Sequence, residues 1–136
     1  MREEVNTVPT VALTKENFEE TVVNNEMVFV DFWASWCQPC KTFAPIYEEV
    51  SADYPGIVFG QVNTEEEQEL AAHFGIRSIP TLLLFREQII LFQESGVLPR
   101  EGLESLIQQA RELDMAQVRQ DIEQQEGGQG ENPNSS

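Results

Sequence analysis

The chain has 136 residues, which is enough for one domain with a complete hydrophobic core. Its 24 acidic residues outnumber 8 basic ones and give a net charge of −16, with no basic cluster to neutralise phosphates, so the composition argues against a nucleic-acid partner. No apolar run approaches the roughly 18 residues of a membrane span, and residues 1–7 lack the apolar core of a secretory signal.

These features lead us to expect a soluble, cytoplasmic protein with no membrane partner. Strong acidity favours solubility and a monomer, because copies of like charge repel each other. A weak dimer is the alternative.

Hydrophobic periodicity divides the chain into alternating strands and helices. Residues 1–9 are predicted to form a flexible lead-in. The run from Met27 to Trp33 is apolar except for Asp31, as expected of a strand that is covered on both faces. The predicted strands cover 10–13, 27–33, 57–62, 81–85 and 89–94. One short predicted helix follows Thr14, and three further predicted helices cover 37–54, 64–74 and 99–113.

These elements describe a mixed sheet with helices on both faces. The turn near residues 86–88 lacks the Asn-Gly signal, which leaves the register of the last two strands open. Asp114 has the character of an N-cap for an extra amphipathic helix over 114–122. From Glu123 to residue 136 the chain is an acidic, polar tail of Gln, Glu, Gly, Asn and Ser, and we predict that it is disordered because it cannot bury a core.

The only two cysteines, Cys37 and Cys40, form a Cys-x-x-Cys motif where a strand gives way to a helix. A bridge between them closes too small a loop to add much stability, so the spacing indicates redox chemistry. Side chains at i and i+3 are neighbours on a helix, which lets a disulfide form and open. Cys37 lies nearest the helix N-terminus, where unpaired N–H groups favour a thiolate. We therefore assign Cys37 as the attacking nucleophile and Cys40 as the resolving thiol.

Asp31 is the one charge inside the apolar strand, six residues before Cys37. Burial raises the pKa of a carboxyl group, which would let Asp31 accept the proton of Cys40 near neutral pH. The alternative is that Asp31 faces solvent at the end of the strand.

The chain resembles the thioredoxin family over residues 10–113, which we take as one domain. The resemblance rests on Asp-Phe-Trp-Ala-Ser-Trp-Cys-Gln-Pro-Cys-Lys at 31–41, Ala-Pro at 44–45, Gly-Ile-Arg-Ser-Ile-Pro-Thr-Leu-Leu-Leu-Phe at 75–85, and Gly96. It implies an α/β thioredoxin fold, in which four helices flank a central five-stranded mixed sheet, here followed by the C-terminal helical extension. It also implies that protein disulfides are the substrates. The resemblance implies as well that no cofactor is bound and that electrons come from NADPH through a flavoprotein thioredoxin reductase.

The resemblance further implies a cis peptide bond before Pro80, opposite the cysteines, and a surface that docks the substrate. An extended substrate would pair with the backbone at Ile79. The surface is made by Trp36, Pro39, Ile76, Ile79, Pro80 and Gly96. Core packing is the alternative for Trp36. No metal site is expected, because two cysteines and the single distant His73 do not supply the four ligands of a zinc site.

Two departures from the family pattern affect the redox pair. Gln38 stands where Gly is common, and Gln61 stands where the family usually has a lysine near the aspartate. The missing positive charge predicts that Asp31 titrates higher than in relatives with that lysine. A protein-disulfide reductase is the favoured function. The alternatives are a disulfide oxidase or isomerase, and a co-chaperone-like binding module that docks partners through the helix at 114–122.

Overall fold

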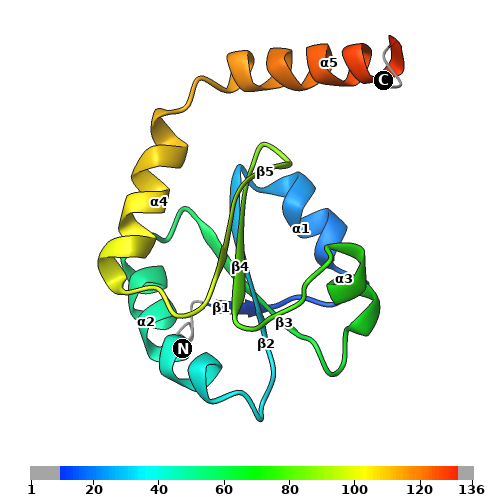
Figure 1. Cartoon of the computed structure of the whole chain (residues 1–136). Coiled ribbons are helices and arrows are strands. Elements are labelled where there is room, and N and C mark those ends of the chain that lie inside the picture. Colours follow the sequence, from blue (N-terminus) through cyan, green and yellow to red (C-terminus); the bar gives the residue numbers. More distant parts are fainter. Residues whose placement is uncertain (1–9, 132–136) are drawn as a thin grey trace.

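A five-stranded mixed sheet forms the centre of the computed structural model, which describes residues 10–131 (Figure 1). The strands follow the order β1-β3-β2-β4-β5 across the sheet. Strand β3 is parallel to β1 and β2, whereas β4 is antiparallel to β2 and β5. Their bounds are β1 Thr10–Ala12, β2 Met27–Trp33, β3 Val58–Asn63, β4 Thr81–Arg86 and β5 Ile89–Ser95. The expected lead-in at residues 1–9 lies outside the described residues.

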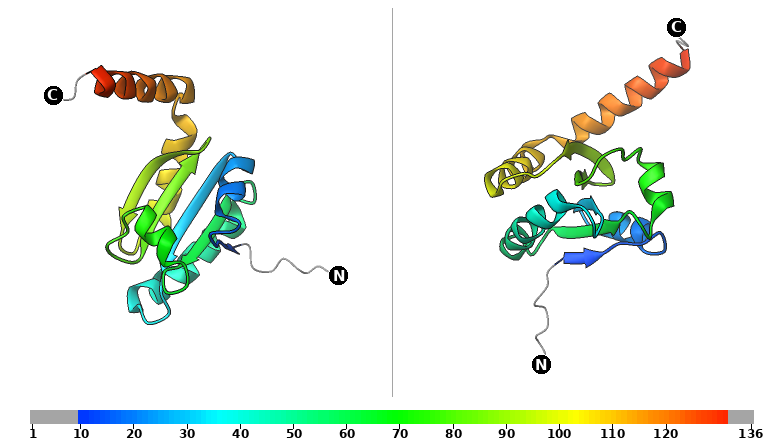
Figure 2. Two further views of the ribbon diagram at one scale, coloured as in Figure 1. Left: turned by 90° about the vertical axis from the view of Figure 1, so that its right-hand side faces the viewer. Right: turned by 60° about the horizontal axis from the view of Figure 1, so that its bottom comes forward.

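Two pairs of helices cover the two faces of the sheet, as the family resemblance implies (Figures 1 and 2). Helices α2 and α4 pack on one face and helices α1 and α3 on the other. Alternate residues of β2 supply both cores, with Phe29 in the first and Val30 in the second, because successive side chains of a strand point to opposite faces. The helices are α1 Phe18–Asn24, α2 Gln38–Asp53, α3 Gln68–His73, α4 Arg100–Glu112 and α5 Met115–Glu131.

The hairpin between β4 and β5 has a definite register, with Thr81 opposite Ser95 and Arg86 opposite Ile89. An irregularity between Leu84 and Phe85 shifts the pairing. The two residues of the turn, Glu87 and Gln88, both have positive φ angles, 53° and 71°. Positive φ at both central residues is the signature of a type I′ turn, whose twist matches that of the flanking strands.

The C-terminal helix is longer than predicted. The expected helix over 114–122 begins as anticipated, with the Asp114 carboxylate accepting the backbone N–H of Gln117 at 3.3 Å. The disorder predicted from Glu123 is wrong for residues 123–131, which continue helix α5, while 132–136 lie outside the described residues. Low apolar content shows that a segment cannot bury a core of its own. It does not stop a helix that has already started, because each further residue adds a backbone hydrogen bond.

Helix α5 lies at the end of the sheet far from the N-terminus of α2 (Figures 1 and 2). Within residues 10–131, no helix combines the length and the apolar character that crossing a membrane requires.

Candidate active site

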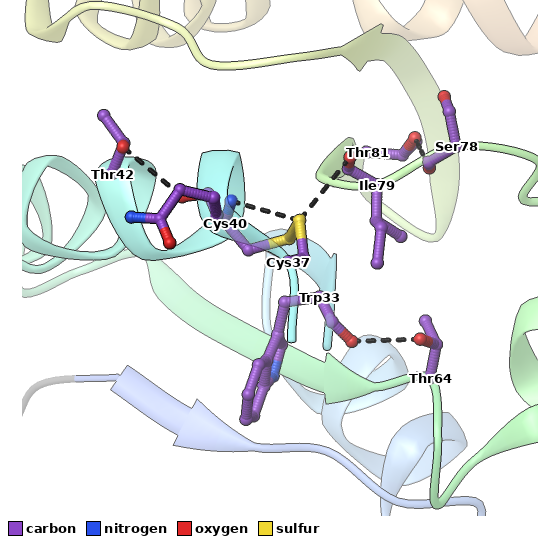
Figure 3. Close-up of a disulfide and its surroundings, with 9 residues drawn as sticks. Trp33, Cys37, Cys40, Thr42, Thr64, Ser78, Ile79 and Thr81 are labelled. Atoms are coloured by element: carbon purple, nitrogen blue, oxygen red, sulfur yellow. Dashed lines mark hydrogen bonds between the residues drawn. A yellow bond between two sulfur atoms is a disulfide. The ribbon is translucent and has the colours of Figure 1, made fainter. Parts of the chain in front are cut away.

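The cysteines lie where β2 passes into α2 (Figure 3). Cys37 is the N-cap residue of α2, and its Sγ accepts the backbone N–H of Cys40 at 3.2 Å. Pro39 lies in the first turn, where its missing N–H costs no helical hydrogen bond. The two cysteines form a disulfide, with their Cα atoms 5.3 Å apart. The structure therefore shows the oxidised form of the pair.

Both cysteines are buried in this form, with 4% of Cys37 and 5% of Cys40 exposed. They pack with Ala34, and the half-buried Trp33 and Ile79 border this small cluster. Because Cys37 is buried in the oxidised form, a reaction partner can approach its sulfur only by way of the residues that surround it.

Ile79 and Pro80 bring the start of β4 against the cysteines. The peptide bond between Ile79 and Pro80 is cis, as the resemblance implies. The carbonyl oxygen of Ile79 lies 3.8 Å from Cys37 Sγ, and the carbonyl of Pro80 accepts the N–H of Gly96 at 2.8 Å. Within residues 10–131 the backbone N–H of Ile79 makes no hydrogen bond, so it is available to an incoming chain.

Trp36 lies on the surface with 68% of its area exposed, so the alternative of core packing is wrong. It lines a pocket of about 210 Å³ together with Ile76 and Ile79. The other lining residues are Thr64, Ala71, Arg77 and Ser78. The structure therefore gathers three of the expected docking residues into one hollow, while Pro80 and Gly96 are joined beside it by their backbone hydrogen bond.

Asp31 is buried, with 2% of its area exposed, so the solvent-facing alternative is wrong. Asp31 is two residues after Phe29 on β2 and therefore lies on the same face of the sheet. It pairs with Gln61 of β3 on one side and with Leu82 of β4 on the other. Within the described residues its Oδ1 has no hydrogen-bond partner. Burial raises the pKa of Asp31 from 3.8 to about 7. A carboxyl group with this pKa gains and loses a proton near neutral pH.

Tyr47 of helix α2 is a buried residue that the sequence does not single out. Its hydroxyl donates to the carbonyl of Gly60 at 2.8 Å in the buried interior. The pKa of Tyr47 lies well above its usual range, first because of burial and second because of the charge of Asp31. The tyrosine therefore stays protonated in the neighbourhood of this carboxyl group.

A second pocket, of about 360 Å³, adjoins Cys40 and was not foreseen. Its lining includes Lys41 and Gln61, and the other residues are Trp33, Ala34, Ser35 and Ala44. No local sequence pattern predicts it, because its lining joins the start of α2 to Gln61 of strand β3. Cys40 and Gln61 therefore lie in the wall of the same pocket.

No group of three or more metal-binding side chains occurs in the part of the chain that the structure describes. His73 lies at the end of α3, where its ring packs edge-on against Phe74 at 4.8 Å between centroids. This contact gives His73 a packing role.

Comparisons with known proteins agree with this geometry. A family model described as Thioredoxin matches residues 9–109. "Putative thioredoxin 2" from Streptomyces coelicolor is 52% identical over 121 residues, covering 89% of this chain and 90% of the relative. "Thioredoxin" from Buchnera aphidicola is 44% identical over 99 residues, covering 71% of this chain and 92% of the relative.

The solved structure of a mutant thioredoxin from Halobacterium salinarum superposes with a TM-score of 0.72 at 27% identity, covering 78% of this chain and 96% of the other. The residues that the family model matches include the strand-to-helix junction that carries the paired cysteines. The chain therefore belongs to the thioredoxin family, and its cysteine pair makes it a thiol–disulfide oxidoreductase.

Proposed function

We propose that the protein reduces the disulfides of other proteins, with Cys37 as the attacking thiolate and Cys40 as the resolving thiol. The observation that carries the proposal is the position of Cys37 Sγ at the N-terminus of α2, where it accepts the N–H of Cys40 at 3.2 Å. A thiolate at this position gains a hydrogen bond and the favourable end of the helix dipole, both of which lower a thiol pKa. Cys40 lies one turn further into the helix.

The reaction consists of two exchanges. The Cys37 thiolate attacks one sulfur of a substrate disulfide, so that a mixed disulfide forms and the other substrate sulfur leaves as a thiolate. The Cys40 thiolate then attacks Cys37 Sγ and releases the second substrate sulfur. Two electrons pass to the substrate, and the protein ends with the Cys37–Cys40 disulfide.

Asp31 serves the second exchange by taking the proton of Cys40. Its pKa of about 7 and its lack of a hydrogen-bond partner within the described residues support this role. Water in the pocket that Cys40 and Gln61 line would carry the proton to and from the surface.

Substrates dock as an extended chain beside the redox pair. The backbone of Ile79 pairs with the substrate strand, and Trp36, Ile76 and Gly96 supply contact surface. Pro39 and Pro80 border the cysteines without offering a backbone N–H. The exposed Trp36 and the open N–H of Ile79 support this arrangement.

Electrons come from NADPH through a flavoprotein thioredoxin reductase, the route that is typical of the family. We place this system in the cytoplasm and the protein in it as a monomer. The chain has no cysteines other than the redox pair, which fits a compartment where structural disulfides are rare.

Three measurements test the proposal. The dithiol protein should reduce insulin, Cys37→Ser should abolish the reduction, and Cys40→Ser should accumulate a mixed disulfide through Cys37. If Cys40→Ser traps no substrate while Cys37→Ser does, the roles are reversed.

One alternative, a disulfide oxidase or isomerase, is favoured by Gln38. This residue changes the dipeptide between the cysteines, which is known in the family to set the reduction potential. Equilibration with glutathione measures this potential. A value well above the cytosolic poise of about −220 mV would show an oxidase or isomerase instead.

A further inference from the structure

Most basic residues of this acidic protein are already engaged. Four of the seven in the described part of the chain form ion pairs, and a fifth, Arg111, stacks on the ring of Tyr54 at 5.4 Å. The ion pairs are Lys15–Glu69, Arg86–Glu26, Arg100–Asp53 and Arg119–Glu87. Within residues 10–131, the two cations left without an ion pair or an aromatic partner are Lys41 and Arg77.

Both of these cations lie at the redox site. Lys41 lines the pocket that has Cys40 in its wall, and Arg77 lines the pocket of Trp36 and Ile79. Both side chains are exposed. They come from different elements, the first turn of α2 and the loop before β4, so the fold brings one positive charge to each of the two hollows beside the disulfide.

Neither hollow has a carboxylate in its lining. Glu65 accepts the hydroxyl hydrogen of Ser35 at 3.0 Å, and although Ser35 lines the Lys41 pocket, Glu65 lines neither. The pocket beside Lys15, by contrast, is lined by five glutamate and glutamine side chains in addition to the lysine. In a chain of net charge −16, the positive charge that lacks an ion pair within residues 10–131 is therefore concentrated at the site where substrates react.

We propose that Lys41 and Arg77 select protein disulfides that are flanked by acidic side chains. This inference rests on the reductase function and names its substrate class. An acidic polypeptide segment can place one carboxylate near each cation while an apolar side chain enters the Trp36 pocket. Repulsion from the rest of the acidic surface is screened beyond a Debye length of about 8 Å at physiological salt, so the local attraction decides the choice.

The test compares three peptides that share one sequence with an internal disulfide and differ only in carrying Glu, Gln or Lys on both flanks. The dithiol protein reduces each, and kcat/KM is measured. An exposed ion pair of about 0.3–1 kcal/mol corresponds to about two- to fivefold in affinity. We therefore expect the Glu peptide to exceed the Gln peptide by about two- to fivefold for each cation engaged, through KM, and the advantage to shrink at high salt.

The readout in variants is the ratio of kcat/KM for the Glu peptide over the Gln peptide. A change in Cys37 reactivity alters both values alike and cancels in this ratio. Lys41→Gln with Arg77→Gln should bring the ratio close to one. The matched control, Lys15→Gln with Arg111→Gln, removes the same charge at a distance from the site and should keep the ratio of the native protein.

The inference is overturned if the double variant at the site keeps the native ratio, or if the control pair lowers it equally, since net charge alone would then act. It is also overturned if glutathione disulfide, which has carboxylates but no apolar side chain, is reduced as efficiently as the Glu peptide. Equal reduction of all three peptides would disprove the selection by charge but would still support the reductase function. Failure to reduce any of them removes the reductase function itself.

Discussion

Asp31 is the residue at which stability and function oppose each other. Its carboxyl group is buried, and its Oδ1 has no hydrogen-bond partner within the described residues. Charging such a group inside a protein is costly because the ion loses its hydration. The same burial raises its pKa to about 7, the range in which it can serve proton transfer.

Asp31→Asn should remove a pH-dependent loss of stability. Below about pH 4, Asp31 is protonated in both the folded and the unfolded protein. As the pH rises above about 4, Asp31 ionises first in the unfolded chain, so the free energy of unfolding falls. The fall ends when the pH has passed the pKa of the folded state, about 7. Between pH 5 and pH 8 this amounts to about 3 kcal/mol. Urea unfolding of the oxidised proteins at both pH values should show the variant gaining that amount relative to the native chain.

The control for that experiment is Asp121→Asn, which removes an exposed carboxylate on α5. Its pH dependence should follow that of the native protein. If Asp31→Asn also follows the native curve, the carboxyl group of Asp31 does not carry the raised pKa.

Gln61→Lys should lower the pKa of Asp31 toward its ordinary value. Gln61 pairs with Asp31 across β2 and β3, and a positive charge near a carboxyl group favours its ionised form. A carboxyl NMR titration of native and variant proteins measures the change. Gln109→Lys adds the same charge on the exposed side of α4 and should leave Asp31 unaffected. A native value near 4 would contradict the effect of burial as well as the prediction.

At the level of single residues, the sequence predicts groups whose signal is local. Cys37, Cys40 and Asp31 stand out from their neighbours, and the structure brings the cysteines together and buries the aspartate. Tyr47 does not stand out, because an apolar helix face predicts burial but gives no sign that the hydroxyl meets a carbonyl of strand β3. The pocket beside Lys41 depends in the same way on distant residues such as Gln61.

Among the elements, the β4–β5 turn is the least suited to its own sequence. Residues other than Gly and Asn rarely adopt positive φ, yet Glu87 and Gln88 do so. Pairing of the flanking strands enforces this conformation, and the N–H of Glu87 adds a hydrogen bond to the carbonyl of Glu26 at 2.8 Å. The sequence could not predict the turn because the forces that hold it lie outside it.

Gln88→Gly should therefore stabilise the protein by about 0.5–1 kcal/mol, because glycine adopts positive φ without a steric penalty. The free energy of unfolding from urea titration measures the gain. Gln93→Gly places the same change within strand β5, where glycine only adds flexibility, and should lower stability by a similar amount. A loss of stability in both variants would show that the turn is not strained by its side chains.

Helix starts show why element boundaries are harder to predict than elements. The sequence predicts a helix over 64–74, but the hydroxyl of Thr64, which could have capped its start, donates to the carbonyl of Trp33 at 3.1 Å instead. Helix α3 begins only at Gln68. A long-range bond thus displaced a local one, as tertiary structure often does when the two compete.

On the scale of the whole molecule, the redox site and the C-terminal helix occupy opposite ends (Figure 1). Helix α5 is nonetheless attached to the rest of the protein. Met115 is 5% exposed, Arg119 forms an ion pair with Glu87, and Arg86 donates to the carbonyl of Leu113 at 3.3 Å, two residues before α5 begins. These contacts anchor the first turns of α5 to its own domain, while the rest of the helix extends away from the sheet (Figure 2).

Truncation after Leu113 should therefore lower stability and leave catalysis intact. Exposing the surface that Met115 covers, and losing Met115 itself, costs about 1.5–3 kcal/mol. Truncation after Glu123 keeps Met115 and Arg119 and should retain nearly the native stability, which makes it the matched control. Urea unfolding, mass in solution and insulin reduction should be measured for both. Because α5 lies far from Cys37, unchanged mass and reduction rate are expected in each truncated protein, whereas a lost dimer or a lost partner in the shorter one alone would show that α5 is a docking element.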